Sequence, residues 1–302
     1  MRSKAKALTI SLAIISSISL QSVLANETWK KQNSHSRVAK TDNLNYSQIV
    51  NEDVTRFQNF FVKKFPNVEF EEFNNGVYAI DSESREQWIE MEDFPPYELA
   101  VDEGKILFEQ KFDNGKSYAD CFPDFKKGVR QNYPRFDQKT NQVVTLELAI
   151  NQCREANNTT PFAYDSEEIT AISGYLAFLS RGNKFNLQVN SINAYNAYLA
   201  GKRFYYSKRG QLNFACSDCH IKITGTKLRA DTVSPGLGHP TGMPVYRSKW
   251  GELGSIGRRY QECNKNVRAV PFDLQSEVYR NLEYFQTIMS NGLEVNGPSS
   301  RK

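Results

Sequence analysis

Residues 216–220 read Cys-Ser-Asp-Cys-His, and this stretch constrains the fold more than any other part of the chain. Two thiols three positions apart, followed directly by a histidine, have the spacing at which a polypeptide attaches haem covalently. Cys216 and Cys219 are expected to form thioethers with the haem, and His220 to bind the iron as its proximal ligand. A stray Cys-x-x-Cys redox pair is less favoured, because the chain has only five cysteines and three histidines.

The N-terminus predicts export from the cytoplasm. Arg2, Lys4 and Lys6 precede an apolar run over residues 7–20, and Val23-Leu24-Ala25 offers a small-residue cleavage site. This order is typical of a secretory signal peptide over residues 1–25. The run is short for a membrane span, so an uncleaved anchor is less favoured and no membrane span is expected. The periplasm, where covalent haem is attached, is the predicted compartment.

The charge of the chain gives little support for nucleic-acid binding. Residues 1–25 hold three basic residues and no acidic one, so the remaining chain carries a formal charge of +1 rather than +4. A nearly neutral protein has no general attraction for a polyanion. No nucleic-acid partner is expected.

Apolar periodicity predicts a mainly α fold. Helices are expected over 46–65, 98–110, 143–154, 167–180, 191–206 and 276–290, with a short strand at 76–80 and loops over 112–142 and 222–250. A helix ending in Gly-Lys and a phenylalanine precedes both Cys121 and Cys216. This weak repeat predicts two tandem cytochrome c-like domains. Their expected ranges are 46–163 and 164–302, after a flexible leader over 26–45, and only the second carries covalent haem.

Three cysteines remain once the haem takes two. An odd number in an oxidising compartment leaves one that is free, intermolecular or chemically special. Cys121 and Cys153 lie in the same half of the chain, and we expect them to form a disulfide. Cys263 is then the odd cysteine. If its segment is helical, Arg259 shares its face, and nearby cations favour a thiolate and hold a small dianion beside the sulfur. A solvated basic helix with an inert cysteine is the competing interpretation.

The second face of the haem iron has more than one possible ligand in the sequence. His239, Met243 and Cys263 all follow the haem motif. Met243, in a Gly-Met-Pro stretch, is the default for a simple electron carrier. A Cys263 thiolate would lower the reduction potential and suit a redox enzyme, whereas His239 suits a hydrogen bond in its loop.

Several separated stretches together resemble one known family. They are 129–131, 133–137, 144–147, 150–151, 153–154, 216–220, 238–241, 244–247, 258–260 and 263–269, of which Arg258-Arg259-Tyr260 and Cys263 form the most specific part. The chain resembles SoxA, the larger subunit of the SoxAX cytochromes of bacterial thiosulfate oxidation, from about residue 95 onward.

The resemblance implies an L-cysteine S-thiosulfotransferase. Such an enzyme joins thiosulfate oxidatively to a cysteine of the carrier SoxYZ and passes two electrons to cytochrome c. The implied partner is SoxX, in a heterodimer. Cys263 is implied as an iron ligand carrying a persulfide, and Arg259 as its anion-binding neighbour, aided by Arg258, Lys265 and Arg268.

The same resemblance implies that the chain carries one haem. Some members of the family carry two, but Cys121 is followed by Phe122-Pro123-Asp124-Phe125, without a second cysteine or a histidine. The chain therefore resembles the single-haem members, in which Cys121 and Cys153 are paired. The alternatives are a periplasmic electron carrier with Met243 as axial ligand, and an accessory subunit in which haem serves stability and docking.

Overall fold

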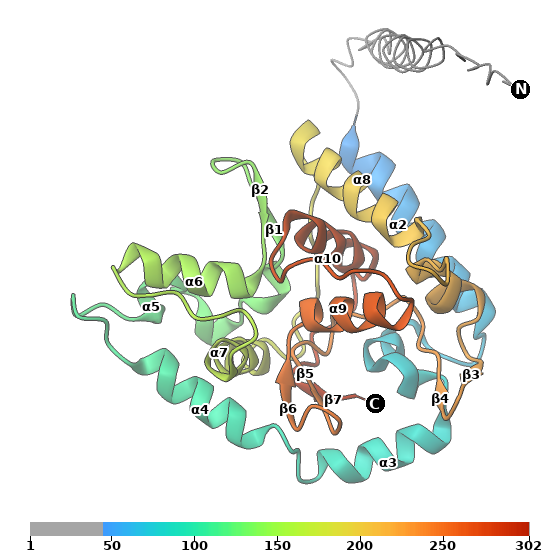
Figure 1. Cartoon of the computed structure of the whole chain (residues 1–302), viewed down its shortest axis with the longest axis horizontal. Coiled ribbons are helices and arrows are strands. Elements are labelled where there is room, and N and C mark those ends of the chain that lie inside the picture. Colours follow the sequence, from blue (N-terminus) through green and yellow to red (C-terminus); the bar gives the residue numbers. More distant parts are fainter. Residues whose placement is uncertain (1–44, 302) are drawn as a thin grey trace, which may run out of the picture. The chain divides into compact units, whose positions relative to one another are not determined.

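The computed structural model describes residues 45–301, which form one compact unit. The predicted signal peptide and all but the last residue of the predicted leader lie outside this range. The helical elements are α2 (Tyr46–Lys64), η1 (Phe70–Ala79), α3 (Ser82–Glu92), α4 (Glu98–Glu109), α5 (Tyr118–Cys121), η2 (Phe125–Lys127), η3 (Arg130–Asn132), α6 (Leu146–Ala156), α7 (Glu167–Phe178), α8 (Ile192–Tyr206), η4 (Asp218–Lys222), α9 (Ile256–Asn266) and α10 (Glu277–Met289) (Figure 1).

The strands are short and form small sheets beside the helices. They are β1 (Arg135–Asp137), β2 (Gln142–Val144), β3 (Lys227–Leu228), β4 (Asp231–Thr232), β5 (Val245–Arg247), β6 (Glu252–Gly254) and β7 (Ser299–Ser300). β1 pairs with β2 and β3 with β4, both antiparallel. In the third sheet β5 lies between antiparallel β6 and parallel β7. Within the described range, no helix is long and apolar enough to cross a membrane.

Two pairs of helices cross closely, α4 with α7 and α8 with α10. A glycine lies at each crossing. A Cβ atom added to Gly104 would lie 2.0 Å from the carbonyl oxygen of Ala171, and one added to Gly201 would lie 1.9 Å from that of Asn281. Only a residue without a side chain permits backbones to approach so closely.

The order hairpin, helix, helix occurs twice with the same spacing. Arg135 pairs with Val144 in β1–β2, and Val245 pairs with Gly254 in β5–β6, so both partners recur 110 residues later. α6 and α7 follow the first hairpin, and α9 and α10 follow the second. The same shift relates Cys153 in α6 to Cys263 in α9.

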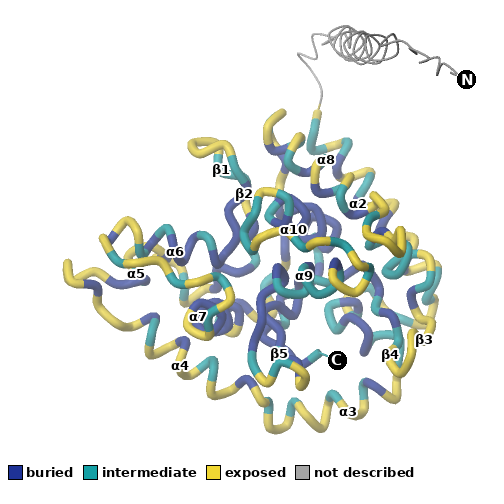
Figure 2. Tube along the Cα trace, in the orientation of Figure 1, coloured by how far each residue is buried: buried dark blue, intermediate teal, exposed yellow. Residues whose placement is uncertain are grey.

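The buried side chains form two clusters. The first runs from Phe108 to Leu176 and includes the apolar face of α7. The second joins α2 to residues of the segment 185–295. α2 thus packs with the second cluster and α7 with the first, and the domain ranges 46–163 and 164–302 stay a prediction. Figure 2 shows buried chain along α7 and α10, whereas α3 and α4 are largely exposed or intermediate.

Four sequence predictions differ from the structure. The stretches 112–142 and 222–250, expected as loops, also hold the short elements α5, η2, η3 and β1, and β3, β4 and β5. Residues 76–80, expected as a strand, belong largely to η1, whose Phe73, Val77 and Tyr78 are buried. The helix expected from residue 143 begins at Leu146, because residues 142–144 pair with β1 and Thr145 caps the helix. The helix α3 was not expected, since its side chains lack an apolar stripe and only Ser84 is buried.

Candidate haem and thiol site

The Cys-x-x-Cys-His stretch folds into a tight helical turn that continues into η4. The Asp218 carboxylate accepts a hydrogen bond from the Ala215 amide at 2.8 Å, and it pairs with the Lys222 ammonium at 2.6 Å. These contacts close the turn at both ends. Cys216, Cys219 and His220 are all half-buried there.

The imidazole of His220 has one nitrogen engaged by the backbone. Its Nδ1 lies 3.0 Å from the Ser234 carbonyl oxygen, so Nδ1 carries the proton and donates it. The surrounding protein lowers the pKa of His220 to about 4, mainly through burial. The ring is therefore neutral at neutral pH, and its Nε2 lone pair is the one suited to bind iron.

His239 lies beside His220 and makes hydrogen bonds through both ring nitrogens. The two ring centres are 4.3 Å apart and the rings are nearly perpendicular. His239 Nε2 lies 3.1 Å from Ser234 Oγ, and Nδ1 lies 3.1 Å from Gln286 Nε2. These contacts agree with a hydrogen-bonding role for His239. Met243 is 9% exposed and packs in the second apolar cluster.

Cys263, from the middle of α9, lies close enough to both haem-motif thiols to affect their titration. Burial, followed by the nearby Cys263 thiol, raises the pKa of the Cys216 thiol to about 12. Burial and Cys263 also raise the pKa of Cys219. The fold therefore brings together three thiols from two segments that are more than forty residues apart.

Cations surround Cys263. Burial lowers the pKa of Arg259 and Arg247, and the negative charge of a Cys263 thiolate opposes this shift in both. Arg259 and Arg247 both pair with Glu262, which follows Arg259 on α9. Arg247 ends β5, and the β5–β6 hairpin places it against α9. Arg247 was not predicted as a site residue from the sequence, because its proximity to Cys263 depends on that hairpin.

The other basic residues suggested for this site, Arg258, Lys265 and Arg268, do not pair with Glu262. Arg258 pairs with Glu252 at 2.6 Å and packs over the Trp250 ring, 4.4 Å from its centre. Lys265 lies in the last turn of α9, and Arg268 follows the helix with a positive φ of 57°. Arg259 is thus the predicted cation that shares a carboxylate with Arg247 beside Cys263.

The expected bond between Cys121 and Cys153 is present. The sulfur atoms are 2.06 Å apart and join α5 to α6, from the exposed Cys121 to Cys153 in the first cluster. Cys153 occupies in the first repeat the position that Cys263 occupies in the second. The first repeat therefore holds a disulfide, whereas the second holds three free thiols.

The residues present fit a haem c. Two half-buried thiols at the required spacing, a neutral imidazole and a third soft donor make up its usual attachment and ligand set. The Tyr205 hydroxyl is buried near Cys216 and Cys219, and within residues 45–301 it has no hydrogen-bond partner. A Cβ on Gly236 would lie 2.3 Å from that hydroxyl, and the Gly236 amide donates to the His220 carbonyl at 2.9 Å. A residue without a side chain at position 236 lets the backbone pass close to both the Tyr205 hydroxyl and the His220 carbonyl.

The helical fold and the Cys-x-x-Cys-His turn define a cytochrome of the c type. Residues 103–185 match the family described as SoxA/TsdA, cytochrome c domain. The chain is 56% identical over 259 residues to the L-cysteine S-thiosulfotransferase subunit SoxA of Chlorobaculum tepidum, covering 86% of this chain and 90% of the relative. It is 50% identical to the subunit of the same name from Allochromatium vinosum, over 83% and 90% of the two chains. The chain belongs to the SoxA family.

A solved structure agrees with this assignment. The crystal structure of SoxXA from P. pantotrophus superposes with a TM-score of 0.67 at 28% sequence identity, covering 74% of this chain and 86% of that one. The SoxA/TsdA match lies on the first repeat, whereas the Cys-x-x-Cys-His motif lies on the second.

Proposed function

We propose that this chain is the SoxA subunit of an L-cysteine S-thiosulfotransferase, a haem protein of thiosulfate oxidation. The observation that carries the proposal is the position of Cys263. Cys263 lies one helical turn after Arg259 on α9, and its charge acts on both thiols of the haem motif and on the guanidinium groups of Arg259 and Arg247. An electron carrier with Met243 as axial ligand has no need of a thiol among cations, and the similarity to SoxA subunits does not favour it.

The proposed cofactor is one haem c, which Cys216 and Cys219 would attach covalently and whose iron His220 and Cys263 would bind. Two tandem cytochrome c-like units account for the repeated hairpin and helix pair, and only the second has the haem motif. The Cys121–Cys153 disulfide supports this division, since it uses the first unit's cysteines. When bound, haem c supplies one-electron redox chemistry.

The proposed reaction joins two sulfur atoms. A cysteine thiolate of the carrier and a thiosulfate dianion give a cysteine S-thiosulfonate and two electrons, which pass to an acceptor cytochrome c. Arg259 docks the dianion beside Cys263, and Cys263 or its persulfide forms a covalent bond to the substrate sulfur. The carrier thiolate then displaces Cys263.

The proposed partners are SoxX in a heterodimer, the carrier SoxYZ and the acceptor cytochrome c, and the proposed compartment is the periplasm. The similarity to the P. pantotrophus SoxXA structure supports the first partner. The signal-like N-terminus supports the compartment.

The test is the variant Cys263→Ala, produced together with the SoxX partner and assayed with thiosulfate, the carrier and oxidised cytochrome c. We expect turnover to fall by at least about a thousand-fold, since the nucleophile is lost. Intact mass should still show one haem on the chain, because Cys216 and Cys219 remain. Met243→Leu is the matched control and should keep its turnover.

Two results would contradict the proposal. Normal turnover in Cys263→Ala would remove the sulfur chemistry from this residue. A ferric near-infrared sulfur-to-iron band that is lost in Met243→Leu would instead establish the electron-carrier alternative.

A further inference from the structure

Glu262 lies among three cations directly beside Cys263. Its Oε2 is 2.7 Å from Arg247 Nη1 and also pairs with Arg259 Nη1, while its Oε1 pairs with Lys249 Nζ. Arg247 comes from the end of β5, Lys249 from the turn after it, and Arg259 from α9. We call these four residues the Glu262 cluster.

The cluster is partly shielded from water. The Glu262 side chain is 14% exposed and that of Arg247 10%, whereas Arg259 is 29% and Lys249 58% exposed. Charges at such a position are screened less than those on an open surface. The exposed end of the cluster, at Lys249 and Arg259, is where an anion from solution reaches it.

The cluster holds more cations than anions. Its three cations and one carboxylate sum to +2, and the charges of Asp231 and of a Cys263 thiolate also act on the same three cations. The charge of Cys263 acts on Arg247, Lys249 and Arg259 alike, so all three cations lie within electrostatic reach of the proposed nucleophile. The Glu262 carboxylate therefore contacts the same three cations that a substrate anion would need to contact.

We propose that Glu262 is an internal anion that sets the affinity of the site for thiosulfate, which binds by taking over Arg259, Lys249 and Arg247 from the Glu262 carboxylate. The inference rests on the proposed function and adds Glu262, Arg247 and Lys249 to its specificity-determining residues. Arginine can share its planar set of donors between two acceptors, so the exchange needs no large movement. Glu262 also holds the three mutually repelling cations together when no substrate is bound.

The decisive variant is Glu262→Gln, which keeps the size of the side chain and removes its charge. Calorimetric titration of the intact haem-loaded complex with thiosulfate, without carrier protein, measures Kd directly. We expect Kd to fall by about ten-fold, because one competing negative charge is lost at close range. Sulfate, a dianion without a reactive sulfur, should become a stronger inhibitor by a similar factor.

Lys249→Ala provides a second test in a side chain that is more than half exposed and does not support the core. We expect it to raise the Kd for thiosulfate about three-fold to ten-fold. Glu72→Gln is the matched control, since Glu72 is a carboxylate paired with Arg85 and outside the Glu262 cluster. It should leave Kd unchanged.

The outcomes separate the two proposals. If the wild-type complex does not bind thiosulfate, the proposed function itself fails. If the wild type binds it, but Glu262→Gln binds it equally or more weakly, Glu262 does not compete with the substrate and this inference is overturned. An unchanged Kd in Lys249→Ala would exclude Lys249 from the substrate's contacts.

Discussion

Arg259 and Cys263 are four residues apart on α9, so their side chains share one face of the helix. The neighbouring hairpin brings Arg247 to the Glu262 carboxylate that Arg259 also contacts, and the charge of Cys263 acts on both guanidinium groups. At the scale of residues, the proposed chemistry depends on this pairing of a sulfur nucleophile with fixed cations. Arginine suits the role because it remains charged even where burial lowers its pKa.

Arg259→Ala removes the cation that follows Ser255 in the first turn of α9 and precedes Cys263 by four residues. We expect kcat/KM for thiosulfate to fall about a hundred-fold, since a charged hydrogen-bond donor is lost from a partly buried site. Arg259→Lys should recover part of the loss, because it restores the charge without the planar set of donors. Steady-state kinetics of the intact complex measures both, and an unchanged kcat/KM in Arg259→Ala would remove its docking role.

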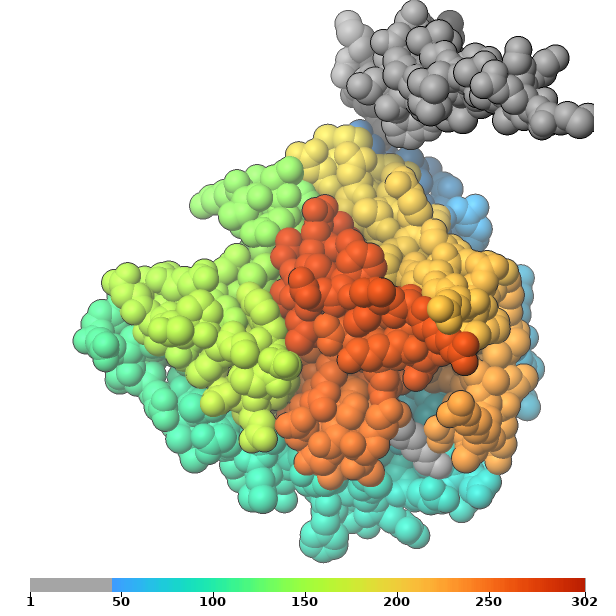
Figure 3. Space-filling model, in the orientation of Figure 1, coloured from blue at the N-terminus to red at the C-terminus, as the bar shows by residue number. Residues whose placement is uncertain are grey.

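At the scale of elements, each repeat depends on one close helix crossing. α8 and α10 meet at Gly201, and α4 and α7 meet at Gly104. α8 ends at Tyr206, and residues 207–215 connect it to the haem motif. On the face drawn in Figure 3, the orange-to-red surface that includes α9 and α10 lies between the green surface of the first repeat and the yellow surface of α8.

Gly201→Ala tests the crossing. An added Cβ would lie 1.9 Å from the Asn281 carbonyl oxygen, so the helices must separate. We expect the free energy of unfolding to fall by about 2–4 kcal/mol, as measured by denaturant titration followed by circular dichroism. The control is Gly174→Ala, whose Cβ would lie 3.0 Å from Leu253 Cδ1, the end of a side chain that can rotate, and at an ordinary contact distance of 3.7 Å from Pro244 Cγ. Equal stabilities of the two variants would contradict this account.

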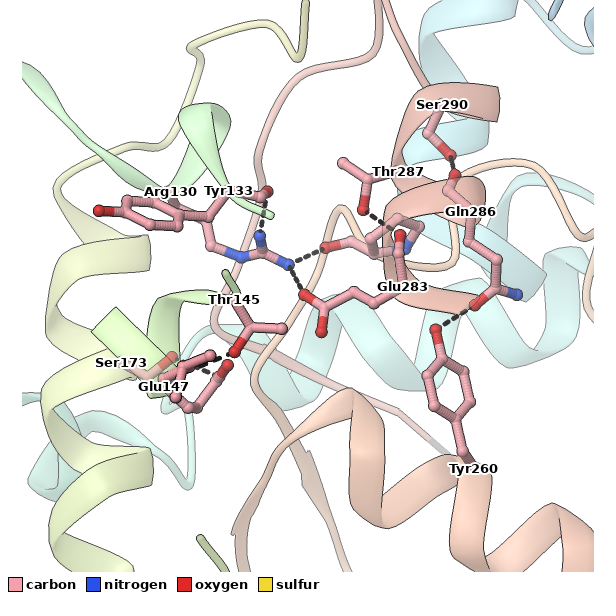
Figure 4. A network of polar contacts seen from close by, with 12 residues as sticks. Arg130, Tyr133, Thr145, Glu147, Ser173, Tyr260, Glu283, Gln286, Thr287 and Ser290 are labelled. Carbon is pink, nitrogen blue, oxygen red and sulfur yellow. Dashed lines mark hydrogen bonds and ion pairs between the residues drawn. The ribbon is translucent and has the colours of Figure 1, made fainter. Parts of the chain in front are cut away.

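At the scale of the whole molecule, a buried polar network joins the two repeats (Figure 4). Arg130, on η3, donates to the Tyr133 carbonyl at 2.6 Å and lies 3.5 Å from the Glu283 carboxylate of α10. Glu147, on α6, accepts a hydrogen bond from Ser173 of α7 at 2.9 Å. Tyr260 of α9 donates a hydrogen bond to Gln286 of α10, and burial, followed by the charge of Glu283, raises the pKa of Tyr260. Two acidic residues therefore share a region that holds one guanidinium.

Glu283 makes stability depend on pH. Burial, followed by the charge of Glu147, raises its pKa to about 8, although Arg130 opposes the shift. The folded chain thus holds a proton that the unfolded chain releases above its ordinary pKa of 4.5. The stabilisation is present in acid and is lost as pH rises from about 4.5 to about 8.

We expect this pH dependence to shrink in Glu283→Gln, which remains neutral at every pH. Denaturant unfolding at pH 5 and pH 8 measures it, and the decrease in unfolding free energy between the two should be smaller than in the wild type. Glu86→Gln, at an exposed position of α3, is the control and should retain the wild-type decrease. A decrease of the same size in Glu283→Gln would show that another group is responsible.

Much of the helical framework was predictable because it depends on local pattern. The apolar stripe Val50, Val54, Phe57 and Phe61 of α2 identifies a helix without any knowledge of its neighbours. Residues 142–144 were misassigned because their strand exists only through pairing with β1. α3 was missed because an exposed helix needs no apolar stripe.

The sequence alone predicts a haem-attachment motif at Cys216, Cys219 and His220, because the spacing of these residues is a local property of the chain. It also isolated Cys263 as the odd cysteine and Arg259 as its helical neighbour. The tertiary structure adds that the charge of Cys263 acts on the haem-motif thiols, and that Arg247 and Lys249 pair with Glu262, the neighbour of Cys263 on α9. Those contacts join segments distant in sequence, so they follow from how the hairpin and helices pack and not from any local pattern.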